Sequence, residues 1–395
     1  MKLSKILTPV AFTVILNTAT SAWAADIVMP KEANADTPAP VAGCETIAGA
    51  KCVIELKTGI KMAYLETGPK DGKTVILLHG LTDTSRSWAT TLDVLHASDP
   101  SLHIFDLDQR GHGATSMPAG ATCPASPKSC FAPPLFAADV ISFMNEKGID
   151  KATIAGHSMG SIIAQEVALL RPERVERIIL IATSNKSRDN PVLRDYVLNE
   201  PVLGSWKKAL DAKGITSPEA VWNATPRDAD PKADEWVAKN WTVDSFADQN
   251  YVNAITPETS VTKMGTWIGA TEALLDFDNT EALAKLTTPT LVLWGSQDSI
   301  FYFAPDQTGM LAALRTSKAP FVWKQYGKVA LPASGVQESD VGHNLQWEVP
   351  KEVAADILSF MSTGQPTLNR TNAELATDGA KIIDTPGKAL LITGN

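Results

Sequence analysis

The feature that most constrains the fold is an alternation of short, uniformly apolar segments with helix-like segments. The apolar segments cover residues 74–78, 102–107, 152–155, 177–182, 290–294 and 321–326. Helical periodicity covers residues 87–96, 135–146, 161–170, 308–314 and 347–360. Strands that are apolar on both faces are typical of a parallel sheet covered by helices on both sides. Residues 52–56 and 61–66 precede this pattern and read as an antiparallel pair. We therefore predict an α/β fold with a mostly parallel central sheet.

The alternation stops between residues 185 and 285, where helical periodicity continues without a convincing strand. The simplest organisation is a sheet core of residues 52–184 and 286–362 with residues 185–285 inserted as a helical cap. Residues 25–51 are expected to form a flexible N-terminal segment, and residues 363–395 a C-terminal tail without an assigned role.

The N-terminus has the three zones of a secretory signal peptide. Lys2 and Lys5 give a positive start, residues 6–16 are apolar, and Ala22-Trp23-Ala24 fits a cleavage site at residue 24. The apolar zone is too short to span a bilayer. Residues 1–24 therefore predict export to the periplasm or the medium.

The four cysteines fall in two close pairs, Cys44 with Cys52 and Cys123 with Cys130. In an oxidising compartment this spacing favours two local disulfides, although three connectivities exist for four cysteines. Neither pair has a histidine at ligand spacing, so a zinc site is not expected.

Charge narrows the range of partners. The formal net charge is −9, and no basic stripe stands out. Nucleic acids and anionic membrane surfaces are therefore poor candidates, and a small molecule is the expected partner.

One serine stands where a strand should turn sharply into a helix. Ser158 is the centre of Gly156-His157-Ser158-Met159-Gly160, directly after an apolar segment and before a helical one. Such a turn forces the serine into strained backbone angles and holds its hydroxyl clear of the chain. The helix that starts at Met159 directs free N–H groups toward the space above the serine. Ser158 is therefore the candidate nucleophile.

A nucleophilic serine needs a base and an orienting acid. Of the six histidines, only His343 follows the helical insertion, in the loop after the last predicted strand. Asp298 follows the strand that ends at residue 294, and Asp306 or Asp340 could take its place. Loops that leave the carboxyl ends of parallel strands share one edge of the sheet, so Ser158, Asp298 and His343 should meet there. The backbone N–H groups of Leu81 and Met159 are the expected oxyanion donors.

These motifs resemble those of cap-bearing serine hydrolases with the α/β-hydrolase fold, over about residues 52–362. The resemblance rests on five segments in order: His79-Gly80, residues 108–113, residues 156–160, residues 294–298 and Gly342-His343. The order Ser, Asp, His also agrees. The chain departs from many relatives at Thr82, where they have proline, and in two long loops at residues 114–134 and after Tyr326. Both loops should border the pocket, so relatives are poor guides to the substrate.

The resemblance implies hydrolysis of a carboxylic ester or lactone with a medium-sized apolar part, through an acyl-enzyme and without a metal or organic cofactor. Two alternatives stay open. The same triad serves C–C bond hydrolases and haloperoxidases that form peracids, and some proteins with this fold are ligand-binding sensors. Epoxide hydrolases and dehalogenases of this fold use an aspartate nucleophile, so Ser158 argues against both.

Aromatic residues are the candidates for the substrate pocket. Half of the ten tryptophans lie in residues 185–285. Most should pack the cap, and one or two should line an apolar pocket. The expected pocket residues are Thr82, Trp88, Trp206, Trp241 and Trp267.

Overall fold

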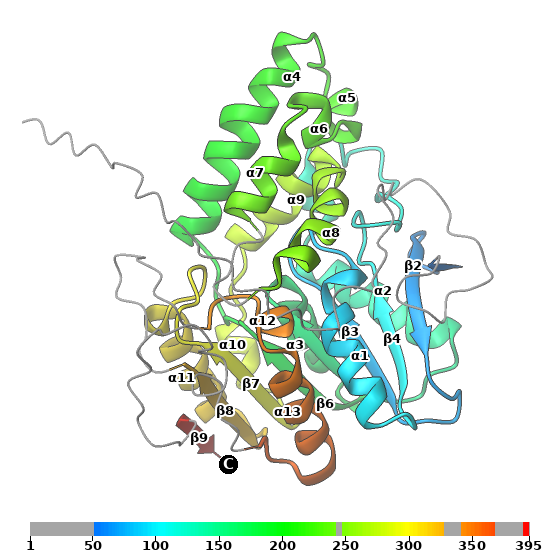
Figure 1. The fold of residues 1–395 in the computed structure, drawn as a ribbon, viewed down its shortest axis with the longest axis vertical. Coiled ribbons are helices and arrows are strands. Elements are labelled where there is room, and N and C mark those ends of the chain that lie inside the picture. Colours follow the sequence, from blue (N-terminus) through cyan, green and yellow to red (C-terminus); the bar gives the residue numbers. More distant parts are fainter. Residues whose placement is uncertain (1–50, 242–246, 328–340, 368–389, 395) are drawn as a thin grey trace, which may run out of the picture.

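The computed structural model describes residues 51–241, 247–327, 341–367 and 390–394 (Figure 1). The predicted signal peptide, Cys44 and Asp340 lie outside the described residues, as does nearly all of the N-terminal segment. Export, the domain boundaries and the Cys44–Cys52 pairing therefore stay predictions.

A nine-stranded sheet forms the centre of the molecule, with strand order β1-β2-β4-β3-β5-β6-β7-β8-β9. From β4 to β8 all neighbours are parallel, whereas β1–β2, β2–β4 and β8–β9 are antiparallel. The strands are β1 Cys52–Glu55, β2 Lys61–Thr67, β3 Thr74–Leu78, β4 His103–Leu107, β5 Ala152–His157, β6 Val175–Ile181, β7 Thr290–Gly295, β8 Phe321–Tyr326 and β9 Leu390–Gly394. The predicted fold class, a mostly parallel sheet opened by an antiparallel pair, is confirmed.

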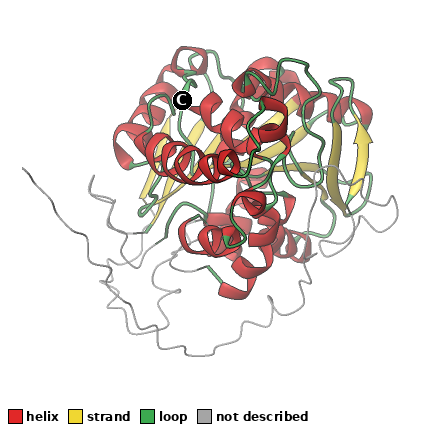
Figure 2. Ribbon diagram, turned by 90° about the horizontal axis from the view of Figure 1, so that it is seen from above, coloured by secondary structure: helices red, strands yellow, loops and turns green. Residues whose placement is uncertain are grey.

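Helices cover both faces of the sheet (Figure 2). On one face lie α1 (Ala89–Ser98) and α13 (Pro350–Thr363), and on the other lie α2 (Pro133–Glu146), α3 (Met159–Leu170) and α11 (Thr308–Thr316). The shorter helices outside the cap region are η1 Ser85–Trp88, η2 Pro127–Cys130, η3 Pro172–Arg174, η5 Phe303–Gln307 and α12 Leu345–Glu348.

The strands alternate between two hydrophobic cores. In β3, Val75 and Leu77 pack with α1 and α13, whereas Ile76 and Leu78 pack with α2 and α3. All four side chains are fully buried. Side chains two residues apart share a face of a strand, so burial on both faces requires the continuous apolar runs seen in the sequence.

The region between β6 and β7 is helical in all its described regular elements. Its helices are η4 Val192–Lys207, α4 Lys208–Ala212, α5 Pro218–Asn223, α6 Pro226–Ala229, α7 Ala233–Asn240, α8 Gln249–Ser260, α9 Met264–Leu275 and α10 Thr280–Leu283. Helices α4 to α9 stand above the sheet in Figure 1, whereas α10 lies beside the sheet. The two ends of this region meet, because Lys186 forms an isolated bridge with Asp278 and the N–H of Ser187 donates to the carbonyl of Phe277.

One strand was not predicted. Residues 390–394 form β9, which pairs antiparallel with the edge of β8, with Trp323 opposite Ile392. It supplies partners for the N–H and C=O groups that β8 would otherwise present to water. No helix in the described ranges is long and apolar enough to cross a membrane.

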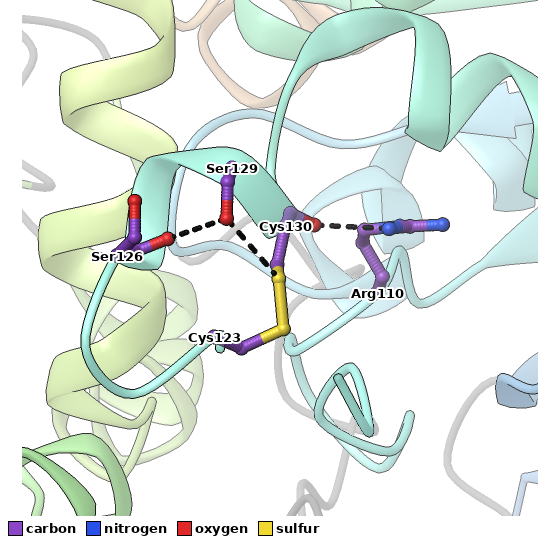
Figure 3. The surroundings of a disulfide bond; sticks show 5 residues. All are labelled: Arg110, Cys123, Ser126, Ser129 and Cys130. Carbon is purple, nitrogen blue, oxygen red and sulfur yellow. Dashed lines mark hydrogen bonds between the residues drawn. A yellow bond between two sulfur atoms is a disulfide. The ribbon is translucent and has the colours of Figure 1, made fainter. Parts of the chain in front are cut away.

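The predicted Cys123–Cys130 disulfide is present, with a Cα–Cα distance of 5.7 Å (Figure 3). It closes the loop that precedes α2. The Nη1 atom of Arg110 donates to the carbonyl of Cys130 at 2.9 Å, so the bridge is joined directly to the segment after β4.

Candidate active site

Ser158 lies on a strained turn between β5 and α3. Its φ of 52° and ψ of −118° are far from the angles that side-chain-bearing residues prefer. The turn is compact: a Cβ on Gly156 would lie 2.2 Å from the carbonyl oxygen of Gly160, and a Cβ on Gly160 would lie 2.2 Å from that of Leu78. Only glycine fits at either position. The Ser158 N–H donates to the carbonyl of Ile181 at 2.9 Å, which ties the turn to β6.

His343 and Asp298 are in direct contact. The Nδ1 atom of His343 lies 2.8 Å from the Oδ1 atom of Asp298, which is fully buried. The same oxygen accepts hydrogen bonds from the backbone N–H groups of Ile300 and Phe301, both at 2.9 Å. Because Oδ1 of Asp298 accepts these hydrogen bonds, Nδ1 of His343 is the donor that carries the proton, and Nε2 is left as the acceptor nitrogen.

The loops that carry these two residues pack tightly. The N–H of Gln297 donates to the carbonyl of Val341 at 2.9 Å. A Cβ on Gly295 would lie 2.1 Å from the carbonyl oxygen of Gly342, so this strand end must be glycine for the two backbones to approach. The proximity of Asp298 and His343 therefore follows from backbone packing at the carboxyl ends of β7 and β8.

Ser158 and His343 line one cavity of about 110 Å³. The apolar lining residues come mainly from the helical region and the loop after β7: Val192, Leu193, Val197, Trp241, Leu274, Ile300 and Phe301. Besides Ser158 and His343, the polar lining residues include Asp83, His157, Asn240, Ser299 and Asn344. Among the described lining residues there is no lysine or arginine. The cavity can therefore hold a small group that makes both apolar and polar contacts.

Of the two predicted oxyanion donors, Leu81 is among the described lining residues of the cavity and Met159 is the neighbour of one, Ser158. Leu81 follows β3 and lines the cavity, and Met159 begins α3 directly after Ser158. The N-terminal end of α3 adds the positive end of its dipole there. This arrangement can stabilise a negative charge that develops on an oxygen beside Ser158.

Of the five predicted pocket residues, only Trp241 lies among the described lining residues. Thr82 is buried and its hydroxyl donates to the backbone carbonyl that precedes it, at 2.7 Å. Trp88 is fully buried in the core with α1. Trp206 and Trp267 pack against each other with ring centroids 5.2 Å apart, in the core of the helical region. These four side chains are taken up by packing, which helical periodicity alone does not distinguish from pocket lining.

The alternative acid, Asp306, has other partners. It accepts from the Ser184 hydroxyl at 3.1 Å and from the Tyr302 N–H at 2.9 Å. Burial, reinforced by the charge of Asp298, raises the pKa of Asp306 to about 7. Asp298, and not Asp306, contacts His343.

Most of the cavity residues were not predicted from the sequence, among them Asp83 and Tyr196. Asp83 follows the oxyanion loop and is 5% exposed. Tyr196 lines the same cavity from η4 and is 66% exposed, which places it at the entrance. In the sequence, only the position of Asp83 three residues after Gly80 could have indicated that it lines the cavity. No sequence feature of Tyr196, apart from its place in the helical region, indicates such a position.

Beside the cavity, buried ion pairs join the helical region to the loop after β3. Lys51 lies 2.8 Å from Asp108, and Arg86 lies 2.6 Å from Glu258 of α8. Glu258 also accepts from the Thr84 hydroxyl. All these side chains are nearly or fully buried. The segment that follows Leu81 is therefore held from both the sheet and the helical region.

Comparison with known proteins identifies the family. Residues 73–350 match the family described as alpha/beta hydrolase fold. An epoxide hydrolase from Caballeronia sordidicola is 22% identical over 336 residues, which cover 79% of this chain and 93% of that protein.

Solved structures share the fold. An esterase from Thermogutta terrifontis superposes with a TM-score of 0.55 at 21% identity, over 79% of this chain and 98% of the other. An enol-lactonase from Burkholderia xenovorans LB400 superposes with a TM-score of 0.53 at 18% identity, and the match covers 78% of this chain and 99% of the enol-lactonase. At such low sequence identity, these structural similarities show a shared fold and do not show a shared substrate. With the strand order, the turn at Ser158 and the match over residues 73–350, they show that the chain is a hydrolase of the α/β hydrolase fold family.

Proposed function

We propose that this protein is a serine hydrolase that cleaves a carboxylic ester or lactone with a medium-sized apolar part. The observation that carries the proposal is the 2.8 Å contact between His343 Nδ1 and Asp298 Oδ1, in a cavity that the strained Ser158 also lines. This contact directs the basic nitrogen of His343 away from the carboxylate.

In the proposed mechanism, Ser158 attacks the substrate carbonyl while Nε2 of His343 takes its proton. Asp298 holds the ring and stabilises the imidazolium. The N–H groups of Leu81 and Met159 stabilise the oxyanion of the tetrahedral intermediate. His343 then gives the proton to the leaving alkoxide, and water, activated by the same base, releases the acyl group from Ser158.

Two features support an ester or lactone over an epoxide, although an epoxide hydrolase is among the relatives. The residue on the turn after β5 is a serine, and the resemblance assigns an aspartate to epoxide hydrolases at this place. The apolar lining residues Val192, Leu193 and Leu274 suit an aliphatic or aromatic group on the ester.

The decisive experiment measures initial rates on p-nitrophenyl esters of increasing acyl length and on a few lactones. Ser158→Ala should lower kcat on the best substrate by about 10⁴-fold or more. Wild-type protein should react with a fluorophosphonate at Ser158. A suitable control is Ser87→Ala, because Ser87 is also buried and its hydroxyl has no hydrogen-bond partner among the described residues. Ester cleavage by Ser158→Ala at the wild-type rate would contradict the proposal.

We also propose that the protein acts outside the cytoplasm. The charge, apolar and Ala-Trp-Ala zones of residues 1–24 support this. N-terminal sequencing of the protein from a periplasmic or culture fraction should begin at Ala25, and a start at Met1 would contradict export.

A further inference from the structure

The peptide group between Ser158 and Met159 includes one of the two proposed oxyanion donors, the N–H of Met159. Its carbonyl, on Ser158, accepts from the hydroxyl of Ser161 at 2.6 Å. The backbone N–H groups of Ser161 and Ile162 donate to the same carbonyl at 2.9 and 3.3 Å. A trans peptide group is planar, and its C=O and N–H point in opposite directions. Contacts that fix the direction of the Ser158 carbonyl therefore also fix the direction of the Met159 N–H.

The hydroxyl of Ser161 has one hydrogen, whose place follows from the partners of the oxygen. The Oγ atom lies 2.6 Å from the carbonyl oxygen of Ser158, which can only accept, so the hydrogen is donated there. The same Oγ atom lies 2.7 Å from Oγ1 of Thr183, and Thr183 must be the donor in this second bond. With its own hydrogen in use, the hydroxyl of Thr183 accepts from Nε2 of Gln165 at 2.8 Å.

The series continues to the place where the helical region rejoins the sheet. Nε2 of Gln165 also donates to the carbonyl of Ser184 at 3.2 Å, which fixes the orientation of this amide. Oε1 of Gln165 accordingly accepts from Nδ2 of Asn279 at 3.0 Å. Each member of this hydrogen-bond chain is buried and donates to the next, in the order Asn279, Gln165, Thr183, Ser161 and the carbonyl of Ser158.

The backbone around Thr183 is fixed as well. Its carbonyl accepts from Nε2 of Gln307 at 2.7 Å, and Oε1 of Gln307 accepts from the indole N–H of Trp323 at 3.1 Å. The preceding residue, Ala182, has a φ of 48°, which is positive like the 52° of Ser158. Residues with such angles persist only when the surrounding structure holds them. Thr183 supplies this support, because it connects the end of β6 to the turn after β5.

We propose that Ser161 and Thr183 are positioning residues of the oxyanion hole, which orient and polarise the N–H of Met159 through the Ser158 carbonyl. The inference rests on the proposed ester hydrolysis at Ser158 and assigns two further residues to it. Hydrogen bonds aligned in one direction polarise one another, so a carbonyl that accepts from the hydrogen-bond chain makes its own peptide N–H a stronger donor. The gain is largest when negative charge develops on the substrate oxygen, and it therefore lowers the barrier more than it tightens substrate binding.

The test measures ester cleavage and the binding of a transition-state analogue with the same variants. An alkyl trifluoromethyl ketone forms an adduct with a serine oxygen in which the former carbonyl oxygen is an anion, so its Ki reports on the oxyanion donors. Ser161→Ala and Thr183→Val each remove one hydroxyl with little change in shape. Each should lower kcat on the best p-nitrophenyl ester by about tenfold, less than the roughly hundredfold loss expected when a donor itself is removed. KM should stay within about twofold, and Ki should rise by about the factor by which kcat falls.

Three further variants separate positioning from a general structural role. Thr183→Ser keeps the hydroxyl and should restore kcat to within about threefold of the wild type. Ser161→Ala combined with Thr183→Val should lose little more than Ser161→Ala alone, because Thr183 acts through Ser161. Thr288→Val is the matched control, since Thr288 is buried and its hydroxyl has no hydrogen-bond partner among the described residues. It should leave both kcat and Ki unchanged.

A kcat within about twofold of the wild type in Ser161→Ala would overturn the inference while leaving ester hydrolysis intact, even if Thr183→Val did not fold. A large fall in kcat with an unchanged Ki would also overturn it, because the oxyanion donors would then be unaffected. Additive losses in the double variant would overturn the route from Thr183 through Ser161. No p-nitrophenol release by the wild type, with no fluorophosphonate labelling of Ser158, would instead overturn the proposed function and the positioning roles with it.

Discussion

At the scale of single residues, the site combines one strained position with several that are held by ordinary hydrogen bonds. Ser158 alone has a positive φ on the turn after β5, and residues in such conformations cost on the order of 1–3 kcal/mol. Asp298, in contrast, has two backbone donors at 2.9 Å and His343 at 2.8 Å, all on one oxygen. The strain at Ser158 therefore lies at the nucleophile, whereas the acid is held through Oδ1 alone, since its buried Oδ2 has no hydrogen-bond partner among the described residues.

The choice between two acids gives a residue-scale prediction. Asp298→Asn should lower kcat by about 10³- to 10⁴-fold with little change in KM, because an amide can stabilise the wrong tautomer of His343. Asp306→Asn should change kcat by less than about threefold, since the carboxyl of Asp306 has a pKa of about 7 and is already partly neutral at that pH. Steady-state kinetics of both variants on one ester provide the measurement. A large loss in Asp306→Asn and a small one in Asp298→Asn would reverse the assignment.

The sequence was informative about residues whose spacing reflects topology. Ser158, Asp298 and His343 follow three different strands, and a parallel sheet brings such positions to one edge. Cavity residues such as Asp83 and Tyr196 were not predicted because lining a cavity depends on side-chain direction and exposure, which neither periodicity nor composition encodes. For the same reason the tryptophans could not be divided between packing and pocket.

At the scale of elements, the loop after β3 is coupled to α8 by buried charges. Arg86 and Glu258 are 2.6 Å apart, and the hydroxyl of Tyr251 donates to the carbonyl of Arg86 at 2.7 Å. Lys51 and Asp108 complete the cluster from the sheet side, where the N–H of Ser85 donates to Asp108 at 2.8 Å. These contacts hold the loop that carries Leu81 against both neighbours.

Removal of one charged residue of this cluster should lower the free energy of unfolding more than removal of both members of an ion pair. Glu258→Leu leaves Arg86 buried without its carboxylate and should lower the free energy of unfolding by about 3–5 kcal/mol. Arg86→Met combined with Glu258→Leu should recover most of that loss, because the uncompensated charge is gone. Urea unfolding of the wild type, both single variants and the double variant gives the coupling free energy between Arg86 and Glu258. Additive losses would show that the two residues act independently.

The disulfide gives a second prediction for an element. Cys123→Ala with Cys130→Ala should lower the free energy of unfolding by about 2–3 kcal/mol, because the reduced loop gains freedom in the unfolded chain. Urea unfolding under non-reducing conditions measures it. Unchanged stability would mean that contacts such as Arg110 with the Cys130 carbonyl hold the loop without the bridge.

Among the elements, the strands with long apolar runs were predicted within two residues of their ends, and β9 was missed. Its five residues are separated from β8 by more than sixty positions, and a short edge strand has no periodicity strong enough to stand out. Its pairing depends on a free edge of the finished sheet, which is a property of the whole fold.

At the scale of the whole molecule, buried neutral histidines link stability to pH. Burial lowers the pKa of His79 to about 3 and of His112 to about 4, and the pKa of His157 is also far below 6.5. In the unfolded chain the same rings take up protons near pH 6.5. Protonation therefore favours the unfolded state, and the stability present above pH 6.5 is lost as the pH falls toward 4 and below.

Urea unfolding at pH 8, 6.5, 5.5 and 4.5 should show this dependence. Each histidine that stays neutral in the fold should make the free energy of unfolding fall by up to about 1.4 kcal/mol per pH unit below pH 6.5. Asp306, whose pKa is raised to about 7 in the fold, contributes in the opposite direction, so the histidine contribution is measured by comparison with a variant. His112→Phe should make the fall below pH 6.5 shallower by up to about 1.4 kcal/mol per pH unit. The same slope in His112→Phe and the wild type would show that this ring binds protons equally in the folded and unfolded states.

The two ends of the helical region meet where this region leaves and rejoins the sheet, and this closeness has a practical consequence. Because Lys186 and Asp278 lie side by side, we expect that the helical region of a relative grafted between them would leave the register of β6 and β7 unchanged. Chimaeras made at this junction should exchange the apolar lining residues of the helical region, such as Val192 and Leu274, while keeping Ser158, Asp298 and His343 in place. For engineering, the sheet core with its three candidate catalytic residues can then be kept, and the helical region can be exchanged to change the shape of the cavity.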